Sequence, residues 1–189
     1  MRHFTNCLTQ ATAFVALVLL LVLTVTAQEP ELKEPSLTKQ EKVKVDYSKP
    51  DAVAKAIKDA AFDWVKLDIA AQNIPLIHKG RITHDVLEID FGRLVFDKDL
   101  PAELDKRGLA FADPLTAITY ATKFPDRQTL RPINILFTDK QGHSCYLLLG
   151  GGPDRRFKTM PANVGHWGPG ARFLVIRKSA VSKIIAAHK

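Results

Sequence analysis

His143 and Cys145 are the two residues of this 189-residue sequence whose types and spacing come closest to a catalytic pair. If the segment is a β-strand, residues two positions apart project from the same face. An imidazole beside a thiol lowers the thiol pKa and produces a nucleophilic thiolate. However, residues 146–149 are typical of a buried strand, in which cysteine is commonly a core residue. We therefore favour a structural Cys145 and keep a small thiol-dependent hydrolase or transferase as an alternative.

The histidines follow no recognised metal-binding motif. His78 and His84 lie six positions apart, which is not a usual chelate spacing, and the sequence has neither HExxH nor paired CxxC. A zinc site that combined His143 and Cys145 with His78, His84 or His166 is the alternative, since zinc accepts mixed nitrogen and sulfur ligands. We predict no metal site and no cofactor.

Positive charge is concentrated in the second half of the chain. Residues 114–189 contain 12 Lys and Arg but only three acidic residues, whereas residues 51–113 contain 9 Lys and Arg and 12 Asp and Glu. Arg155, Arg156 and Lys158 follow three consecutive glycines, whose backbone N–H groups are available to an anion. Arginine binds carboxylate or phosphate through a planar fork. The pattern indicates either an anion-binding surface or pairing of the two halves with each other.

Trp167 lies in residues 163–170, where three glycines and a proline exclude regular structure. Its indole ring either covers the core or forms an exposed platform on which a sugar or a peptide side chain stacks. For the second case we predict one ligand-facing surface composed of Arg155, Arg156, Lys158, Arg172, His166 and Trp167.

These features favour a non-enzymatic binding module with a basic surface. Its expected partner is an anionic lipid surface, an acidic polysaccharide or an acidic protein. A structural subunit whose basic half meets an acidic neighbour in an envelope assembly is a further alternative. Nucleic acid is not an expected partner, because no motif that reads nucleic acid accompanies the charge.

The N-terminal segment has the pattern of a secretory signal peptide, which we predict over residues 1–27. Arg2 is its only full charge, residues 14–23 are all Leu, Val, Ala or Phe, and Val25 and Ala27 suit a signal peptidase. An uncleaved membrane anchor is the alternative. Both interpretations make the rest of the chain extracytoplasmic, either periplasmic or secreted. Direct membrane contact is expected only if this segment is not cleaved.

A flexible linker is predicted over residues 28–50, which mix Glu and Lys with three prolines and contain few large apolar side chains. Val43 and Val45 alternate with lysines, which leaves an edge strand as the alternative. Residues 51–189 are then a single domain.

The domain should open with a helix that ends before Pro75, since apolar residues recur there at spacings of three and four: Val53, Ile57, Ala60, Trp64, Leu67 and Ala71. Asp113 and Pro114 begin a second helix, and Ser179 caps a last one. Strands are predicted at residues 86–91, 133–137, 143–149 and 172–177, with a bend at Gly92 and a hairpin turn at residues 139–142. This order favours an α+β fold with an antiparallel sheet of four to five strands and helices on one face.

Overall fold

A computed structural model describes residues 34–150, 152–163 and 165–178. The predicted signal peptide and the helix expected after Ser179 lie outside these residues. Within them, no helix is long and apolar enough to cross a membrane. The strands are β1 (Ser36–Leu37), β2 (Glu41–Asp46), β3 (Trp64–Leu67), β4 (Arg81–Asp90), β5 (Val95–Phe96), β6 (Leu109–Phe111), β7 (Ile133–Thr138), β8 (Ser144–Leu149), β9 (Arg156–Pro161), β10 (His166–Trp167) and β11 (Arg172–Arg177). The helices are α2 (Ala52–Asp59), α3 (Leu100–Asp105), α4 (Pro114–Lys123), α5 (Arg127–Leu130) and the 3₁₀ turn η1 (Ala71–Asn73).

The fold is α+β, as predicted, but its sheet is larger and mixed. In the described residues, nine strands form the sheet in the order β1-β4-β11-β7-β8-β9-β3, with β2 also paired to β4 and β6 to β11. Strands β5 and β10 form a separate pair. The β11–β7 and β3–β9 pairs are parallel. The expectation of four to five antiparallel strands was therefore wrong. Strands β1, β3 and β6 have two to four residues and are too short to show an alternating pattern, and the six-residue strands β2 and β9 were also missed.

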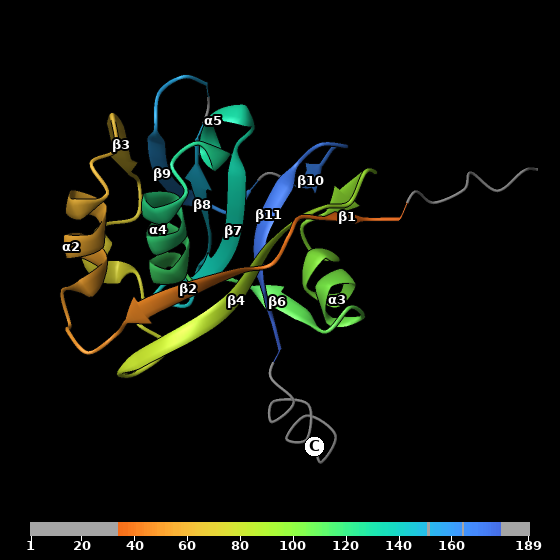
Figure 1. The fold of residues 1–189 in the computed structure, drawn as a ribbon. Coiled ribbons are helices and arrows are strands. Elements are labelled where there is room, and N and C mark those ends of the chain that lie inside the picture. Colours follow the sequence, from red (N-terminus) through yellow and green to blue (C-terminus); the bar gives the residue numbers. More distant parts are fainter. Residues whose placement is uncertain (1–33, 151, 164, 179–189) are drawn as a thin grey trace, which may run out of the picture. The chain divides into compact units, whose positions relative to one another are not determined.

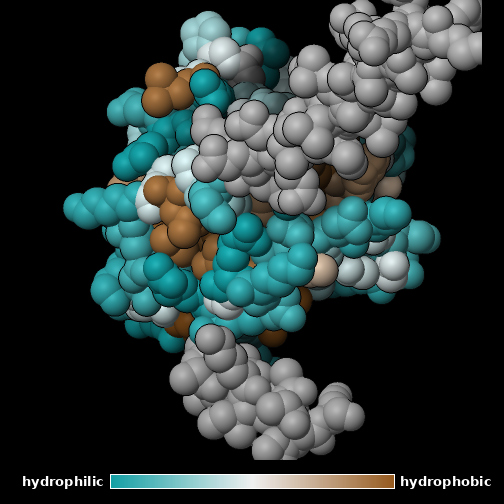
Figure 2. Space-filling view, turned by 90° about the vertical axis from the view of Figure 1, so that its right-hand side faces the viewer, coloured by the Kyte–Doolittle hydropathy of each residue, from teal (hydrophilic) through white to brown (hydrophobic). Residues whose placement is uncertain are grey.

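Helices cover both faces of the sheet rather than one. Adjacent residues of a strand point to opposite faces, and in β11 Leu174 packs with α2 and α4 whereas Val175 packs with α3. Figure 1 shows α2 and α4 on one side of the sheet and α3 on the other. The side that carries α3 is mainly hydrophilic, with small separate hydrophobic areas (Figure 2).

Part of the predicted linker belongs to the folded domain. Strand β2 pairs antiparallel with β4 over its whole length. The side chains of Val43 and Val45 are 0% and 2% exposed, while Lys42 and Lys44 point to solvent. The linker prediction was wrong here, because it used the average composition of the segment and gave less weight to its two-residue alternation.

The first helix is shorter than predicted. It ends at Asp59, the chain turns at Ala61, whose φ is 48°, and residues 64–67 form the edge strand β3. Trp64 and Leu67 are 45% and 40% exposed rather than buried in a helix interface. Hydrogen bonds hold β3 in place, since Thr159 of β9 both accepts from and donates to the backbone of Ile69.

Structural features that depend on residues close in the sequence were predicted correctly. Asp113 caps α4, where its Oδ1 accepts hydrogen bonds from the backbone N–H groups of Leu115 and Thr116. Strands β7 and β8 form the expected hairpin. Gly92 has a φ of 64° at the bend after β4.

Candidate functional site

The structure does not bring the side chains of His143 and Cys145 together. His143 precedes β8, its side chain is 73% exposed, and its Nδ1 lies 3.3 Å from Asp139 Oδ2. Cys145 is fully buried, and within the described part of the chain its thiol donates only to the His143 backbone carbonyl, at 3.5 Å. Burial and the Asp139 carboxylate raise the pKa of the Cys145 thiol. This geometry gives a thiol-dependent enzyme no support, because the reactive species would be the thiolate.

We expect iodoacetamide near neutral pH to leave Cys145 unmodified in the folded chain and to modify it completely in concentrated urea. The raised pKa and the absence of solvent contact both slow alkylation. Mass spectrometry of the peptides separates Cys145 from Cys7. Alkylation of Cys145 in the folded chain as fast as in urea would contradict the buried thiol.

Arg172 is part of the protein interior rather than of a ligand surface. Its Nη1 donates to Glu88 Oε2 at 2.7 Å, and its Nη2 donates to the backbone carbonyls of Arg127 and Arg131. Glu88 is 1% exposed and also accepts a hydrogen bond of 2.7 Å from Tyr120. Arg172 therefore neutralises a buried carboxylate, which sequence analysis could not see because the partner is 84 residues away.

The pocket beside Arg172 is electrically balanced. Its arginines pair with its carboxylates: Arg172 with Glu88, and Arg131 with Asp90 at 3.9 Å. The lining residues are Ser36, Thr38, Glu88, Asp90, Leu130, Arg131 and Arg172. An anion would gain little there, because each positive charge already has a partner.

Trp167 covers the core. Its indole Nε1 donates to Asp97 Oδ1 at 2.6 Å, and its ring meets those of Tyr146 and Phe173 edge-on at 5.1 and 5.3 Å. His166 precedes it in β10 and pairs with Phe96 of β5. Trp167 thus belongs to the layer that contains α3, while the side chain of His166 is exposed.

Arg155 also makes contacts within the protein. Its guanidinium lies 5.4 Å from the centre of the Phe62 ring, and its Nη2 donates to the Ala121 carbonyl of α4 at 3.3 Å. Its backbone N–H donates to Asp63 Oδ2 at 2.7 Å. Arg155 therefore ties the start of β9 to the helical layer.

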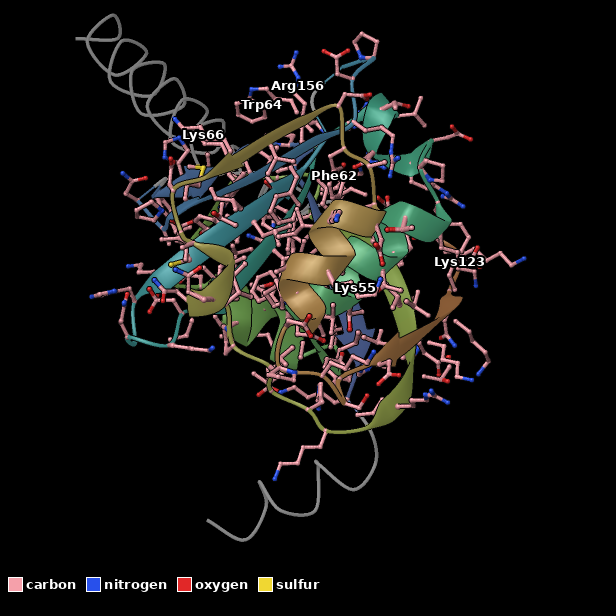
Figure 3. The ribbon with its side chains drawn as sticks, turned by 90° about the vertical axis from the view of Figure 1, so that its left-hand side faces the viewer. Lys55, Phe62, Trp64, Lys66, Lys123 and Arg156 are labelled. Carbon is pink, nitrogen blue, oxygen red and sulfur yellow. The ribbon has the colours of Figure 1, made fainter. Side chains whose placement is uncertain are left out.

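Only Arg156 and Lys158 of the six predicted residues share one surface, and β3 adds Trp64 and Lys66 to it. In the parallel β3–β9 pair, Trp64 is the neighbour of Arg156, and Lys66 is the neighbour of Lys158. Phe157 between them points into the helix-covered core, so these four side chains lie on the opposite face. We call them the cationic patch. Figure 3 shows Trp64, Lys66 and Arg156 beside one another, away from Lys55 and Lys123.

The charges of the cationic patch are available to a ligand. Arg156 pairs with Asp154 at 3.1 Å and Lys66 with Asp68 at 3.6 Å. The side chains of these two ion pairs are between 33% and 53% exposed. Exposed ion pairs of this kind contribute about 0–1 kcal/mol, so an incoming anion replaces them at small cost. Lys158 has no ion-pair partner among the residues that the structure describes.

A second group of polar residues lies inside the protein, where β2, β4 and α4 meet. Its central atom is the Tyr47 hydroxyl, which donates to Asp113 Oδ2 at 2.7 Å and lies 2.9 Å from His84 Nε2 and 2.8 Å from Thr116 Oγ1. His78 completes the group, with its ring 5.2 Å from that of His84. We call Tyr47, His78, His84, Asp113 and Thr116 the histidine cluster. Sequence analysis noted both histidines but did not pair them with Asp113.

The electrostatics of the histidine cluster favour a neutral His84 ring. Burial lowers the pKa of His84 and outweighs the nearby Asp113 carboxylate, which raises it. Burial also raises the pKa of the Tyr47 hydroxyl, so the hydroxyl keeps its proton at neutral pH. The cluster thus offers imidazole nitrogens and carboxylate or hydroxyl oxygens, which are the usual ligands of zinc and related metals.

Comparison of the chain with protein-family models, with curated proteins and with solved structures found no match. The function therefore has to be inferred from the side chains and their geometry.

Proposed function

We propose that this domain is a non-enzymatic binding module that holds an acidic polysaccharide on its cationic patch. The supporting observation is the register of β3 and β9, which aligns one exposed aromatic ring and three cations on one face. Neighbouring strands lie about 5 Å apart, and alternate residues of a strand about 6.6 Å apart. The four side chains therefore form a compact two-by-two arrangement.

Acidic sugar units fit this arrangement better than a bare phosphate does. The Trp64 ring is 45% exposed and provides a flat apolar surface for a sugar ring. Arg156 beside it offers a planar fork to a carboxylate, and Lys66 and Lys158 supply further positive charge. An isolated anion would use the cations but not the indole ring.

The proposal includes the extracytoplasmic location, for which the support is the sequence pattern of residues 1–27 alone. A periplasmic or secreted module would meet acidic polysaccharide at the cell envelope. An acidic protein and an anionic membrane are the competing partners, and the vesicle measurement below tests the second.

We expect the double substitution Arg156→Glu, Lys158→Glu to weaken binding of the full chain to polygalacturonate about tenfold or more at low salt, since attraction is replaced by repulsion. Lys55→Glu, Lys123→Glu is the matched control, because it changes the net charge equally at exposed positions outside the patch (Figure 3). Retention on a polygalacturonate column and isothermal titration calorimetry measure the effect.

An equal loss in both double variants would show attraction by net charge alone and would contradict the proposal. Anionic vesicles separate a sugar from a lipid headgroup. We expect the unsubstituted chain to bind polygalacturonate more tightly than anionic vesicles at the same salt concentration. We expect Trp64→Ala to weaken polygalacturonate binding, because the sugar loses its stacking surface. If Trp64→Ala does not change the affinity of the chain for polygalacturonate, the indole ring is not part of the site.

A further inference from the structure

We infer that the histidine cluster is a binding site for a divalent first-row transition metal, with His78, His84 and Asp113 as its protein ligands. These three residues offer ligand atoms that all lie within 4.8 Å of one another. They come from three separate elements: the segment after η1, strand β4 and the first residue before α4. The site is distinct from the cationic patch.

The surroundings of the His78 side chain indicate that it binds a ligand. Its Nε2 is shielded from solvent and has no hydrogen-bond partner among the described residues. A buried polar atom without a partner costs free energy, so such atoms generally have a role. Coordination of a metal ion by this imidazole would use its lone pair and remove that cost.

A turn between His78 and His84 explains how two histidines six positions apart in the sequence can bind the same metal ion. Gly80 has a φ of 70°, and its carbonyl accepts a hydrogen bond of 2.7 Å from the Tyr47 backbone N–H. This hydrogen bond ties the turn to the end of β2. His78 and His84 then meet across the turn rather than along one strand.

Asp113 is fixed in the manner of a metal ligand. Its Oδ1 is held by two backbone N–H groups of α4, while its Oδ2 faces the Tyr47 and Thr116 hydroxyls. Hydrogen bonds of this kind orient a ligating carboxylate and tune the metal. The Tyr47 hydroxyl, at hydrogen-bond distance from both His84 and Asp113, is placed to act as a further oxygen ligand or as such a partner.

The distances require only a small contraction. In a tetrahedral zinc site with bonds of about 2.1 Å, ligand atoms lie about 3.4 Å apart. The ligand atoms lie within 4.8 Å of one another, so the widest separation has to close by no more than about 1.4 Å. Movement of His78 can supply this, because no hydrogen bond from its Nε2 holds the ring and the residue is partly exposed.

The test uses the full chain purified without chelators, titrated with Zn²⁺ and, separately, with Co²⁺ as a spectroscopic probe. We expect about one zinc ion per chain and a Co²⁺ absorption spectrum of the intense type given by low coordination numbers. His78→Ala should weaken zinc binding more than about tenfold. It should keep the fold, since the lost nitrogen makes no hydrogen bond among the described residues. Asp113→Asn is the second variant, because asparagine still caps α4 but carries no charge.

His166→Ala and His143→Ala are the controls, since both histidines lie outside the cluster. They should bind zinc as the unsubstituted chain does. The proposal is overturned if the unsubstituted chain binds no stoichiometric zinc or cobalt. It is equally overturned if His78→Ala and Asp113→Asn bind as tightly as the controls, because the metal would then occupy another place. Binding to polygalacturonate should be the same in all of these variants.

Discussion

Gly150→Ala is expected to lower the free energy of unfolding by about 3 kcal/mol. Gly150 follows β8 and has a φ of 104°, a conformation that side-chain-bearing residues rarely adopt. A Cβ at this position would lie 2.2 Å from the backbone carbonyl oxygen of Gln128, well inside van der Waals contact. Relief of the clash requires α5 to move away from the strand, since the contacted atom belongs to the backbone.

Gly152→Ala is the matched control for this change. Gly152 has a φ of 110°, but a Cβ there meets nothing within 4 Å among the described residues. The control therefore carries only the backbone strain, about 1 kcal/mol. Urea denaturation measures both variants. Equal losses in the two would mean that Gly150 and α5 are not in close contact.

Arg172→Leu is expected to lower the free energy of unfolding by about 3–5 kcal/mol, because it leaves the Glu88 carboxylate buried without its positive partner. Glu88→Gln in the same chain should recover a large part of the loss. Glutamine is neutral, and its carbonyl still accepts the hydrogen bond from Tyr120. Chemical denaturation of the two single variants and the double variant measures the coupling.

Arg156→Leu is the matched control, since Arg156 also lies on a strand and has an acidic partner, Asp154. That pair is exposed, so we expect a loss below about 1 kcal/mol. Arg156→Leu should weaken polygalacturonate binding, whereas Arg172→Leu, measured where the chain is still folded, should not. A small loss of stability in Arg172→Leu would return Arg172 to the list of candidate ligand residues.

The elements that sequence analysis predicted well depend on neighbours in the chain. Asp113 caps the helix that starts at the next residue, and the β7–β8 hairpin closes through a short turn. By contrast, β3 is a strand because it pairs with β9, about ninety residues later. Its three- and four-residue apolar spacing matched a helix by coincidence. Local pattern does not identify a partner this distant in sequence.

The candidate sites were predictable only in part for the same reason. Arg156 and Lys158 were identified from charge, and their place on one strand follows from their alternation. Whether a cation is available to a ligand depends on partners that are distant in the sequence. Arg172, for example, is already paired with the carboxylate of Glu88. Of the two positions predicted for Trp167, the structure shows the one that covers the core. The exposed ring of the patch is Trp64, which had been predicted to lie in a helix.

The indole N–H signals of the two tryptophans test most directly whether the cationic patch binds acidic polysaccharide. The chain contains only Trp64 and Trp167, so a ¹H–¹⁵N spectrum shows two such signals, which Trp64→Phe assigns. On titration with oligogalacturonate we expect the Trp64 signal to move in proportion to saturation, while the Trp167 signal stays in place. Binding that moves neither signal, or moves only that of Trp167, would contradict the proposed site.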